Sequence, residues 1–350
     1  MKDEKIYLKS CCASLDSGGI WFVEYSYALL LFFDFSGQKI TIAEVIPTQK
    51  FELTASFFGM YVNKDTVVLI PNTANCIYLY SKSNKTFSTF SVQEACFGLF
   101  REAIEYEGNL FCIPNLYNRI LKFELNSDEM CYFDIESNEI GLSEKHGILS
   151  ACAKDNYIYM VIENRILVFD MQLCKFVSKV CIDNSKLSSV DVSEKYIYVF
   201  DVNKKMIYCL DRKTLKILKG KEIENKNVKI ICFFDTHVIA EAVDTPCRWI
   251  FDEQLNIQKE EINESLSGRK GYCFSKWIKT KDYIYEISAD NHIILYNPFW
   301  KKVFYEINGE KILCQKIREC VLTCRREKKY EVLYESKMLD LQFFISSVLQ

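Results

Sequence analysis

The sequence has few histidines and prolines, and this scarcity limits the chemistry it can support. Only three histidines and five prolines occur among 350 residues. A metal centre needs convergent ligands, and the sequence contains neither a His-x-His nor a Cys-x-x-Cys pair. Scarce histidine also argues against general acid-base catalysis. We therefore expect no metal and no cofactor, and we favour a protein that is not an enzyme.

Long apolar runs and an excess of one charge are missing as well. The longest strongly apolar run, Ala28 to Phe33, is far shorter than the roughly 20 residues that cross a bilayer. The first five residues carry two acids and lack the pattern of a signal peptide. The 44 basic residues nearly balance the 47 acidic ones, whereas a protein that neutralises phosphates usually has a basic excess. We expect a soluble, cytoplasmic monomer with no nucleic-acid or membrane partner.

Cysteine is abundant, with 16 residues. In a reducing cytosol such residues serve mainly as small hydrophobic side chains. Cys152 and Cys232 each lie five residues before an outgoing strand, whereas Cys12 and Cys273 do not share that spacing. A ring of thiols around a channel would require one register. We therefore interpret these cysteines as buried small side chains.

The segment Asp155–Asp170 is the clearest structural unit. Residues 157–162 are aromatic or β-branched for the most part, and Glu163-Asn164 forms a two-residue turn with an Asn that tolerates the left-handed conformation. Residues 165–169 then run back. The Asp that ends the returning strand opens a polar turn, in which its carboxylate can accept backbone N–H bonds. The sequence predicts a β-hairpin here.

The same hairpin recurs along the chain. Aligned returning strands begin at Leu30, Ile77, Ile120, Ile166, Ile207, Arg248 and Ile293. These positions lie 41 to 47 residues apart, which is a period near 44. Each unit has room for four short strands, and four strands in such a period are typical of a propeller blade. The sequence predicts an all-β propeller.

The ends of the chain determine the expected number of blades. Seven units end near Ile307, and three further strand-like runs follow between residues 311 and 335. The segment Lys5–Ser10 could supply the fourth strand and close the ring. We predict eight blades, with seven as the alternative, in a single domain over residues 1–335. Residues 336–350 should form a short amphipathic helix packed on the propeller, because Leu341, Phe344, Ile345 and Val348 share one stripe.

A family resemblance rests on three repeated features: the Tyr-Ile-Tyr strand at residues 157–159, 196–198 and 283–285, the turn Asn, and the Phe-Asp strand end. Together they resemble the kelch-like, NHL-like and quinoprotein-like propeller repeats that are common in bacteria. Residues 14–21 also resemble the Asp-box of sialidases, but the motif occurs once and we interpret it as an ordinary Gly-rich turn. The resemblance implies a propeller that is a scaffold, a ligand binder or an enzyme.

Propellers usually bind on the face made by the central hairpin turns and the loops between blades. On this face we place Asn72, Asn115, Tyr117, Asn164, Asn203 and Asp290. Two long loops between blades add Glu144 with His146, and Arg269 with Lys270. Loops on a rigid scaffold often carry function. The predicted site consists of Asn72, Asn115, Tyr117, Glu144, His146, Asn164, Arg269 and Lys270.

Two functions from different classes fit this sequence. The first is a non-catalytic scaffold that offers its loop face to a protein, peptide or glycan, with aromatic side chains supplying contact area. The second is a hydrolase or lyase that acts on a glycan-like or peptide-like substrate at the channel mouth. No Gly-x-Ser-x-Gly elbow or Gly-rich phosphate loop is present. The sequence therefore favours the first.

Overall fold

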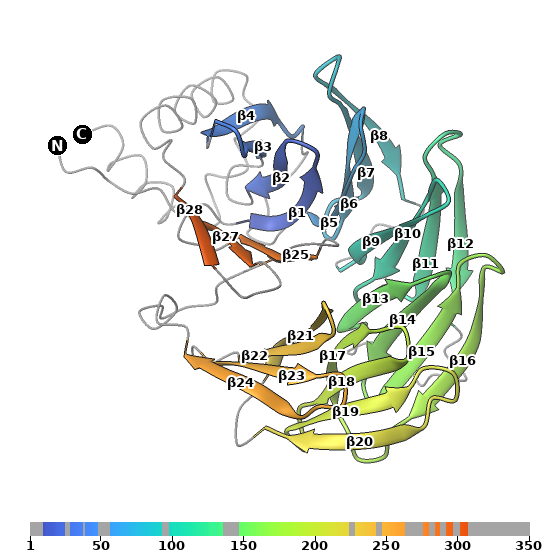
Figure 1. Ribbon diagram of the computed structural model, residues 1–350. Coiled ribbons are helices and arrows are strands. Elements are labelled where there is room, and N and C mark those ends of the chain that lie inside the picture. Colours follow the sequence, from blue (N-terminus) through green and yellow to red (C-terminus); the bar gives the residue numbers. More distant parts are fainter. Residues whose placement is uncertain are drawn as a thin grey trace, which may run out of the picture.

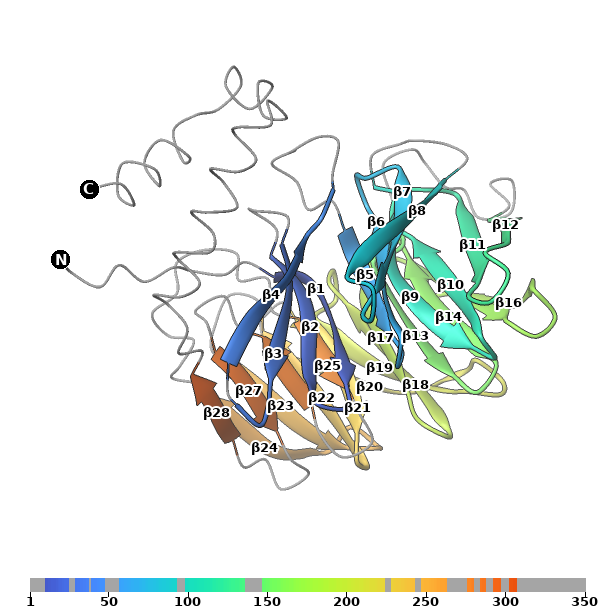
Figure 2. The ribbon, with the colours of Figure 1, turned by 90° about the horizontal axis from the view of Figure 1, so that it is seen from above.

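The computed structural model describes residues 10–24, 29–37, 39–47, 57–92, 98–135, 147–223, 228–242, 247–262, 276–279, 284–287, 292–296 and 302–306. These residues form seven four-stranded antiparallel sheets, each built from four consecutive strands. Figure 1 shows the sheets around a common centre, with the first strand of each sheet innermost and the fourth outermost. Figure 2 shows the same arrangement turned by 90°. The fold is an all-β propeller.

The first three sheets follow directly along the chain. The first contains β1 (Ser10–Asp16), β2 (Gly19–Glu24), β3 (Leu29–Asp34) and β4 (Lys39–Val45). The second contains β5 (Phe57–Val62), β6 (Thr66–Pro71), β7 (Cys76–Ser81) and β8 (Thr86–Ser91). The third contains β9 (Phe100–Tyr106), β10 (Asn109–Pro114), β11 (Arg119–Glu124) and β12 (Met130–Asp134).

Four more sheets complete the described part of the chain. The fourth contains β13 (Ser150–Lys154), β14 (Tyr157–Ile162), β15 (Arg165–Asp170) and β16 (Lys175–Cys181). The fifth contains β17 (Leu187–Val192), β18 (Tyr196–Asp201), β19 (Met206–Asp211) and β20 (Ile217–Glu222). The sixth contains β21 (Val228–Phe234), β22 (His237–Ala242), β23 (Cys247–Asp252) and β24 (Ile257–Ile262). The seventh contains β25 (Lys276–Lys279), β26 (Ile284–Ile287), β27 (His292–Tyr296) and β28 (Lys302–Glu306).

Burial explains why the middle strands are so apolar. In β14 and β18 five consecutive residues are buried, because both faces of these strands pack against neighbouring sheets. A strand covered on both faces carries a continuous apolar run rather than an alternating one. The outermost strands β16 and β20 are mostly exposed and correspondingly polar. In the fourth sheet burial is therefore greatest in the middle strands β14 and β15 and least in the outermost strand β16.

The hydrophobic core is divided into clusters that lie between adjacent sheets. One cluster joins the fourth and fifth sheets, with Tyr159 and Val161 packed against Val199 and Leu210. Another joins the fifth and sixth sheets and includes Trp249. Ile278 of the seventh sheet packs on the core of the first sheet, and β1 contacts β25. The described sheets thus hold together through contacts between neighbours, and the first sheet touches the seventh.

The predicted hairpin is confirmed, with one correction. Strands β14 and β15 pair from Tyr157 opposite Asp170 to Ile162 opposite Arg165, which leaves a two-residue turn. The residue with positive φ in this turn is Glu163, at 52°, and not the Asn164 that tolerates this conformation best. Residue preference alone did not identify the left-handed position.

The predicted Asp turns are also confirmed. Asp170 Oδ1 accepts hydrogen bonds of 2.9 Å from the backbone N–H groups of Gln172 and Leu173. Asp211 Oδ1 accepts corresponding bonds from Lys213 and Thr214. The bonds from the Thr214 backbone and hydroxyl lower the pKa of Asp211. The carboxylate therefore fixes the turn between the third and fourth strands.

Several predictions concern residues outside the described ranges. The eighth unit at residues 311–335, the domain boundary at residue 335 and the helix at residues 336–350 all lie there, as does all of Lys5–Ser10 except Ser10. The contact between β1 and β25 favours the seven-bladed alternative, although the number of blades stays a prediction. Within the described ranges no helix has the length and apolar character needed to cross a bilayer.

Candidate functional site

The predicted binding face, here called the loop face, is formed by the turns between the second and third strands and by the entries into the innermost strands. A backbone seam runs across it from sheet to sheet. The carbonyl oxygen of Asn72 accepts a 2.8 Å bond from Leu99 N, and that of Asn115 accepts a 2.9 Å bond from Ile148 N. The turn between the second and third strands of one sheet is thus hydrogen-bonded to the segment that leads into the innermost strand of the next sheet. This seam gives the loop face a fixed backbone.

Two predicted site residues meet on this seam. The Asn115 side-chain amide donates a 3.1 Å hydrogen bond to Asn72 Oδ1, which links the third sheet to the second. Asn72 is buried and Asn115 is half-buried. Because a buried carboxamide needs hydrogen-bond partners, the pair has a structural role in the seam. Only the half-buried Asn115 also has surface to offer a ligand.

Tyr117 is buried rather than displayed on the face. Its ring lies edge-on to Phe100, with centroids 5.7 Å apart. Hydrogen bonds with Asp134 and with the Tyr117 hydroxyl raise the pKa of Arg119. The 2.6 Å contact between Arg119 Nε and Asp134 Oδ1 ties the outer strands of the same sheet. Tyr117 therefore belongs to the hydrophobic cluster between the second and third sheets.

Leu116 is the residue on this face that sequence reasoning missed. It sits in the turn between Asn115 and Tyr117 with 46% of its surface exposed. Gly98 and Gly147 flank it, because a Cβ built on either glycine would lie within about 3.0 Å of the Leu116 side chain. A Cβ on Gly147 would also lie 1.9 Å from the Asn115 carbonyl oxygen. Each glycine lies just before the innermost strand of its sheet, and this shared position is the sequence feature that could have indicated Leu116.

The other predicted residues are not gathered here. Asn164 is half-buried in the fourth sheet's turn, where its carbonyl oxygen accepts a 2.8 Å bond from Ile182 N. Asn203 is exposed in the corresponding turn of the fifth sheet. The remaining candidates lie outside the described residues: Glu144, His146, Arg269, Lys270 and Asp290. The structure therefore brings together Asn72, Asn115 and Tyr117.

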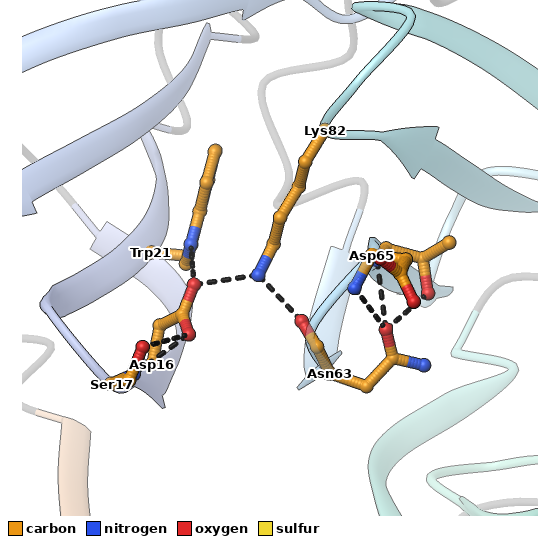
Figure 3. A network of polar contacts seen from close by, with 7 residues as sticks. Asp16, Ser17, Trp21, Asn63, Asp65 and Lys82 are labelled. Carbon is orange, nitrogen blue, oxygen red and sulfur yellow. Dashed lines mark hydrogen bonds and ion pairs between the residues drawn. The ribbon is translucent and has the colours of Figure 1, made fainter.

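On the opposite face, a cluster of charged and aromatic side chains joins the first two sheets (Figure 3). Lys82 Nζ lies 2.6 Å from Asp16 Oδ2 and 2.5 Å from the Asn63 carbonyl oxygen. The indole N–H of Trp21 donates a 2.9 Å bond to the same Asp16 oxygen. Burial raises the pKa of Asp16, but the hydrogen bonds from Lys82 and Trp21 outweigh it and lower the pKa overall. We call this arrangement a clasp.

The clasp recurs between the fourth and fifth sheets. Arg212, like Lys82, is the first residue after the third strand of its sheet. It contacts Asp155 in the preceding sheet's first turn at 2.5 Å and donates a 2.9 Å bond to the Tyr159 hydroxyl. Tyr159 and Trp21 are each the third residue of their second strand. The residues of the Asp-box resemblance, Asp16 and Trp21, therefore belong to a joint between sheets.

The innermost strands bring another polar group to the centre. Asp191 Oδ2 on β17 accepts bonds of 2.7 Å from Phe233 N on β21 and from Lys279 Nζ on β25. Lys279 also donates to the Phe233 carbonyl oxygen at 3.1 Å. Burial lowers the pKa of Lys279, but Asp191 raises it further and the net shift is upward. These bonds hold three consecutive sheets together.

Cys152 and Cys232 occupy the positions on β13 and β21 that Asp191 occupies on β17, since each pairs with the third residue of its second strand. The common spacing of these two cysteines in the sequence is therefore confirmed, with an aspartate between them, whereas Cys12 pairs with Val23 and does not share their register. Burial raises the pKa of both thiols, so they are protonated at neutral pH and are poor nucleophiles.

Among the described residues, no group of three or more His, Cys, Asp or Glu side chains could hold a metal ion.

Comparisons with known proteins identify the fold and nothing finer. No known protein family and no curated protein matches the sequence. BamB from Moraxella catarrhalis is 13% identical, with a TM-score of 0.59 over 84% of this chain and 86% of that one. The Swd1 β-propeller domain of Myceliophteria thermophila is 8% identical, with a TM-score of 0.58 over 82% and 95% of the two chains. The designed protein Ika8 is 7% identical, with a TM-score of 0.56 over 84% and 98%. These similarities agree with the propeller fold and do not select among kelch-like, NHL-like and quinoprotein-like repeats.

Proposed function

We propose that this protein is a non-catalytic, cytoplasmic β-propeller scaffold that binds a protein, peptide or glycan on its loop face. One observation carries this proposal: Leu116 is 46% exposed on a backbone seam that fixes the surrounding turns. An apolar side chain held on a rigid polar surface can bind a partner without a large loss of conformational entropy. Propeller folds in general serve as binding platforms, which agrees with this role.

The aspartates of the joints between sheets and the two cysteines of the innermost strands fit a structural role better than a catalytic one. Asp16, Asp155 and Asp191 are each engaged in a joint between sheets. The thiols of Cys152 and Cys232 are protonated. A catalytic acid or base must instead reach a substrate and exchange protons with it. A cytoplasmic location is consistent with the ten cysteines that the structure shows as free thiols.

The test is quantitative capture of partners from native cytosol with immobilised full-length protein. The loop-face variant is Leu116→Ser combined with Asn115→Ala, and the matched control is Leu173→Ser, on the turn between β15 and β16. Leu173 is 58% exposed, so both leucine substitutions remove an exposed apolar side chain. A partner that binds wild type and control but not the loop-face variant supports the proposal.

A second arm addresses the loops that sequence analysis singled out. The variant Glu144→Ala, His146→Ala, Arg269→Ala and Lys270→Ala should weaken capture of the same partner. Any glycan ligand would be found by applying the same proteins to a glycan array. Equal capture by all variants, or turnover of a glycan or peptide substrate by the wild type, would contradict a non-catalytic loop-face scaffold.

A further inference from the structure

The outer edge of the fifth sheet combines an exposed strand with aliphatic side chains and a local excess of lysine. β20 (Ile217–Glu222) is the last strand of its sheet and pairs only with β19 among the described strands. Five of its six residues are exposed, and Lys221 is half-buried. Ile217 and Leu218 expose 46% and 56% of their surfaces. An edge strand presents backbone N–H and C=O groups that can pair with another chain.

Positive charge is concentrated beside this edge. Residues 212–222 contain five basic side chains and one acidic side chain, Glu222, in a protein whose formal net charge is −3. Arg212 is engaged in the clasp, and Lys219 Nζ lies 2.8 Å from Asn256 Oδ1. Lys213 and Lys216 are exposed, and among the described residues neither forms an ion pair through its side chain. The edge therefore carries positive charge directed to solvent.

Protection against aggregation does not account for this pattern. Lysine on an edge strand does discourage pairing with other copies. The outer strand β16 also carries two lysines, Lys175 and Lys179. However, β8 has no charged side chain, and β24 mixes Lys259 with Glu260 and Glu261. Edge protection by lysine is thus not a general property of these sheets. Two adjacent exposed aliphatic residues on β20 would also work against it.

We propose that the outer edge of β20 binds an extended acidic segment of a partner protein, which adds to the fifth sheet as a further strand. Backbone pairing provides affinity in this mode, and alternate side chains provide specificity. Aliphatic side chains of the segment lie over Ile217 and Leu218, while Asp or Glu side chains face Lys213, Lys216 and Lys219. An exposed strand edge with aliphatic neighbours fits a peptide backbone better than a lipid surface or a nucleic acid. The site is separate from the loop face.

The probe is a fluorescein-labelled ten-residue peptide of alternating Val and Glu, titrated with the full-length protein and followed by fluorescence anisotropy. The variant Lys213→Glu with Lys216→Glu should weaken binding about tenfold or more, which corresponds to about 1.4 kcal/mol. The matched control, Lys64→Glu with Lys85→Glu, makes the same change of charge at two exposed lysines of the second sheet. It should bind within about twofold of the wild type. Leu116→Ser should leave peptide binding unchanged, which separates this proposal from the loop-face proposal.

Two further measurements test the backbone pairing. Two peptides are compared, each methylated on every second backbone nitrogen, with the methylated positions shifted by one residue between them. The peptide whose methylated nitrogens face β20 should lose binding, and the other should keep it. Hydrogen exchange should slow at residues 217–222 when the peptide is bound. The proposal is overturned if no peptide binds, if both methylated peptides bind as well as the parent, or if both charge-reversal variants lose binding equally. Tighter binding of a DNA duplex or of phosphatidylserine vesicles than of the peptide would also overturn it.

Discussion

Lys82 of the second sheet lies 2.6 Å from Asp16 of the first, although 66 residues separate them in sequence. The ammonium also lies 5.5 Å from the centre of the Trp21 ring. The guanidinium of Arg212 lies in the corresponding position over Tyr159, 5.8 Å from the centre of the ring. The same joint thus recurs at two boundaries between sheets. Because each sheet buries its apolar faces only against its neighbours, such joints help to fix the ring.

Replacing Asp16 tests the clasp. Asp16→Asn removes the charge that Lys82 contacts and should lower the free energy of unfolding at pH 7 by about 1–2 kcal/mol. The pKa of Asp16 is lowered in the folded protein, so its contribution is present above the unfolded pKa of about 3.9 and is lost as pH falls through the folded pKa. The difference between wild type and variant should therefore shrink in acid. Urea unfolding between about pH 3 and 7 measures it.

Two control variants accompany this test. Asp65→Asn changes an exposed carboxylate near Lys82 and should alter stability by less than about 0.5 kcal/mol. Asp155→Asn should cost less than Asp16→Asn, because Asp155 is the more exposed and Arg212 keeps its bond to Tyr159. A loss for Asp16→Asn that is the same at every pH would contradict the assigned role of its charge.

The seam on the loop face predicts an effect at Gly147. Gly147→Ala would place a Cβ 1.9 Å from the Asn115 carbonyl oxygen, so the backbone must shift and the Ile148 hydrogen bond must weaken. We expect a loss of about 1–3 kcal/mol in the free energy of unfolding. The matched control is Gly18→Ala, where a Cβ has no atom within 4 Å. Equal stability of the two variants would show that the seam is not tightly packed.

The buried ion pair of the sixth sheet predicts a non-additive result. Arg248 is 1% exposed and Glu241 is 4% exposed, with Nη2 and Oε2 2.5 Å apart. Arg248→Met leaves a buried carboxylate without this partner and should cost about 3–5 kcal/mol. The double variant Glu241→Leu with Arg248→Met should recover most of that loss, because neither charge then remains buried. A double variant as unstable as Arg248→Met alone would contradict this account.

The sequence predicted the repeat because the repeat is a matter of local pattern. A strand packed on both faces must be apolar, and an Asp at its end fixes the next turn, so both features recur about every 44 residues. Arg248 shows the limit of this reasoning. It occupies the aligned position held elsewhere by Leu or Ile, and its buried partner Glu241 is seven residues away across a hairpin. The alignment placed Arg248 correctly but did not reveal the ion pair.

The site was harder to predict because its contacts join different sheets. Asn72 and Asn115 were chosen for their place in the turns, yet their mutual hydrogen bond makes Asn72 part of the seam. Asp191 and Lys279 are 88 residues apart, so no local spacing indicated their contact. No sequence pattern distinguishes Leu116, because an isolated leucine in a turn is an ordinary feature. Contacts of this kind depend on how neighbouring sheets are placed.

The most direct test of the loop-face scaffold is hydrogen exchange of the protein with and without its captured partner. The account predicts slower exchange in the seam, at residues 72–75, 98–99, 115–118 and 147–149, and no such effect with the variant carrying Leu116→Ser and Asn115→Ala. Protection confined to the opposite face, which carries the clasp, or to the innermost strand of each sheet, with the seam unchanged, would contradict binding on the loop face.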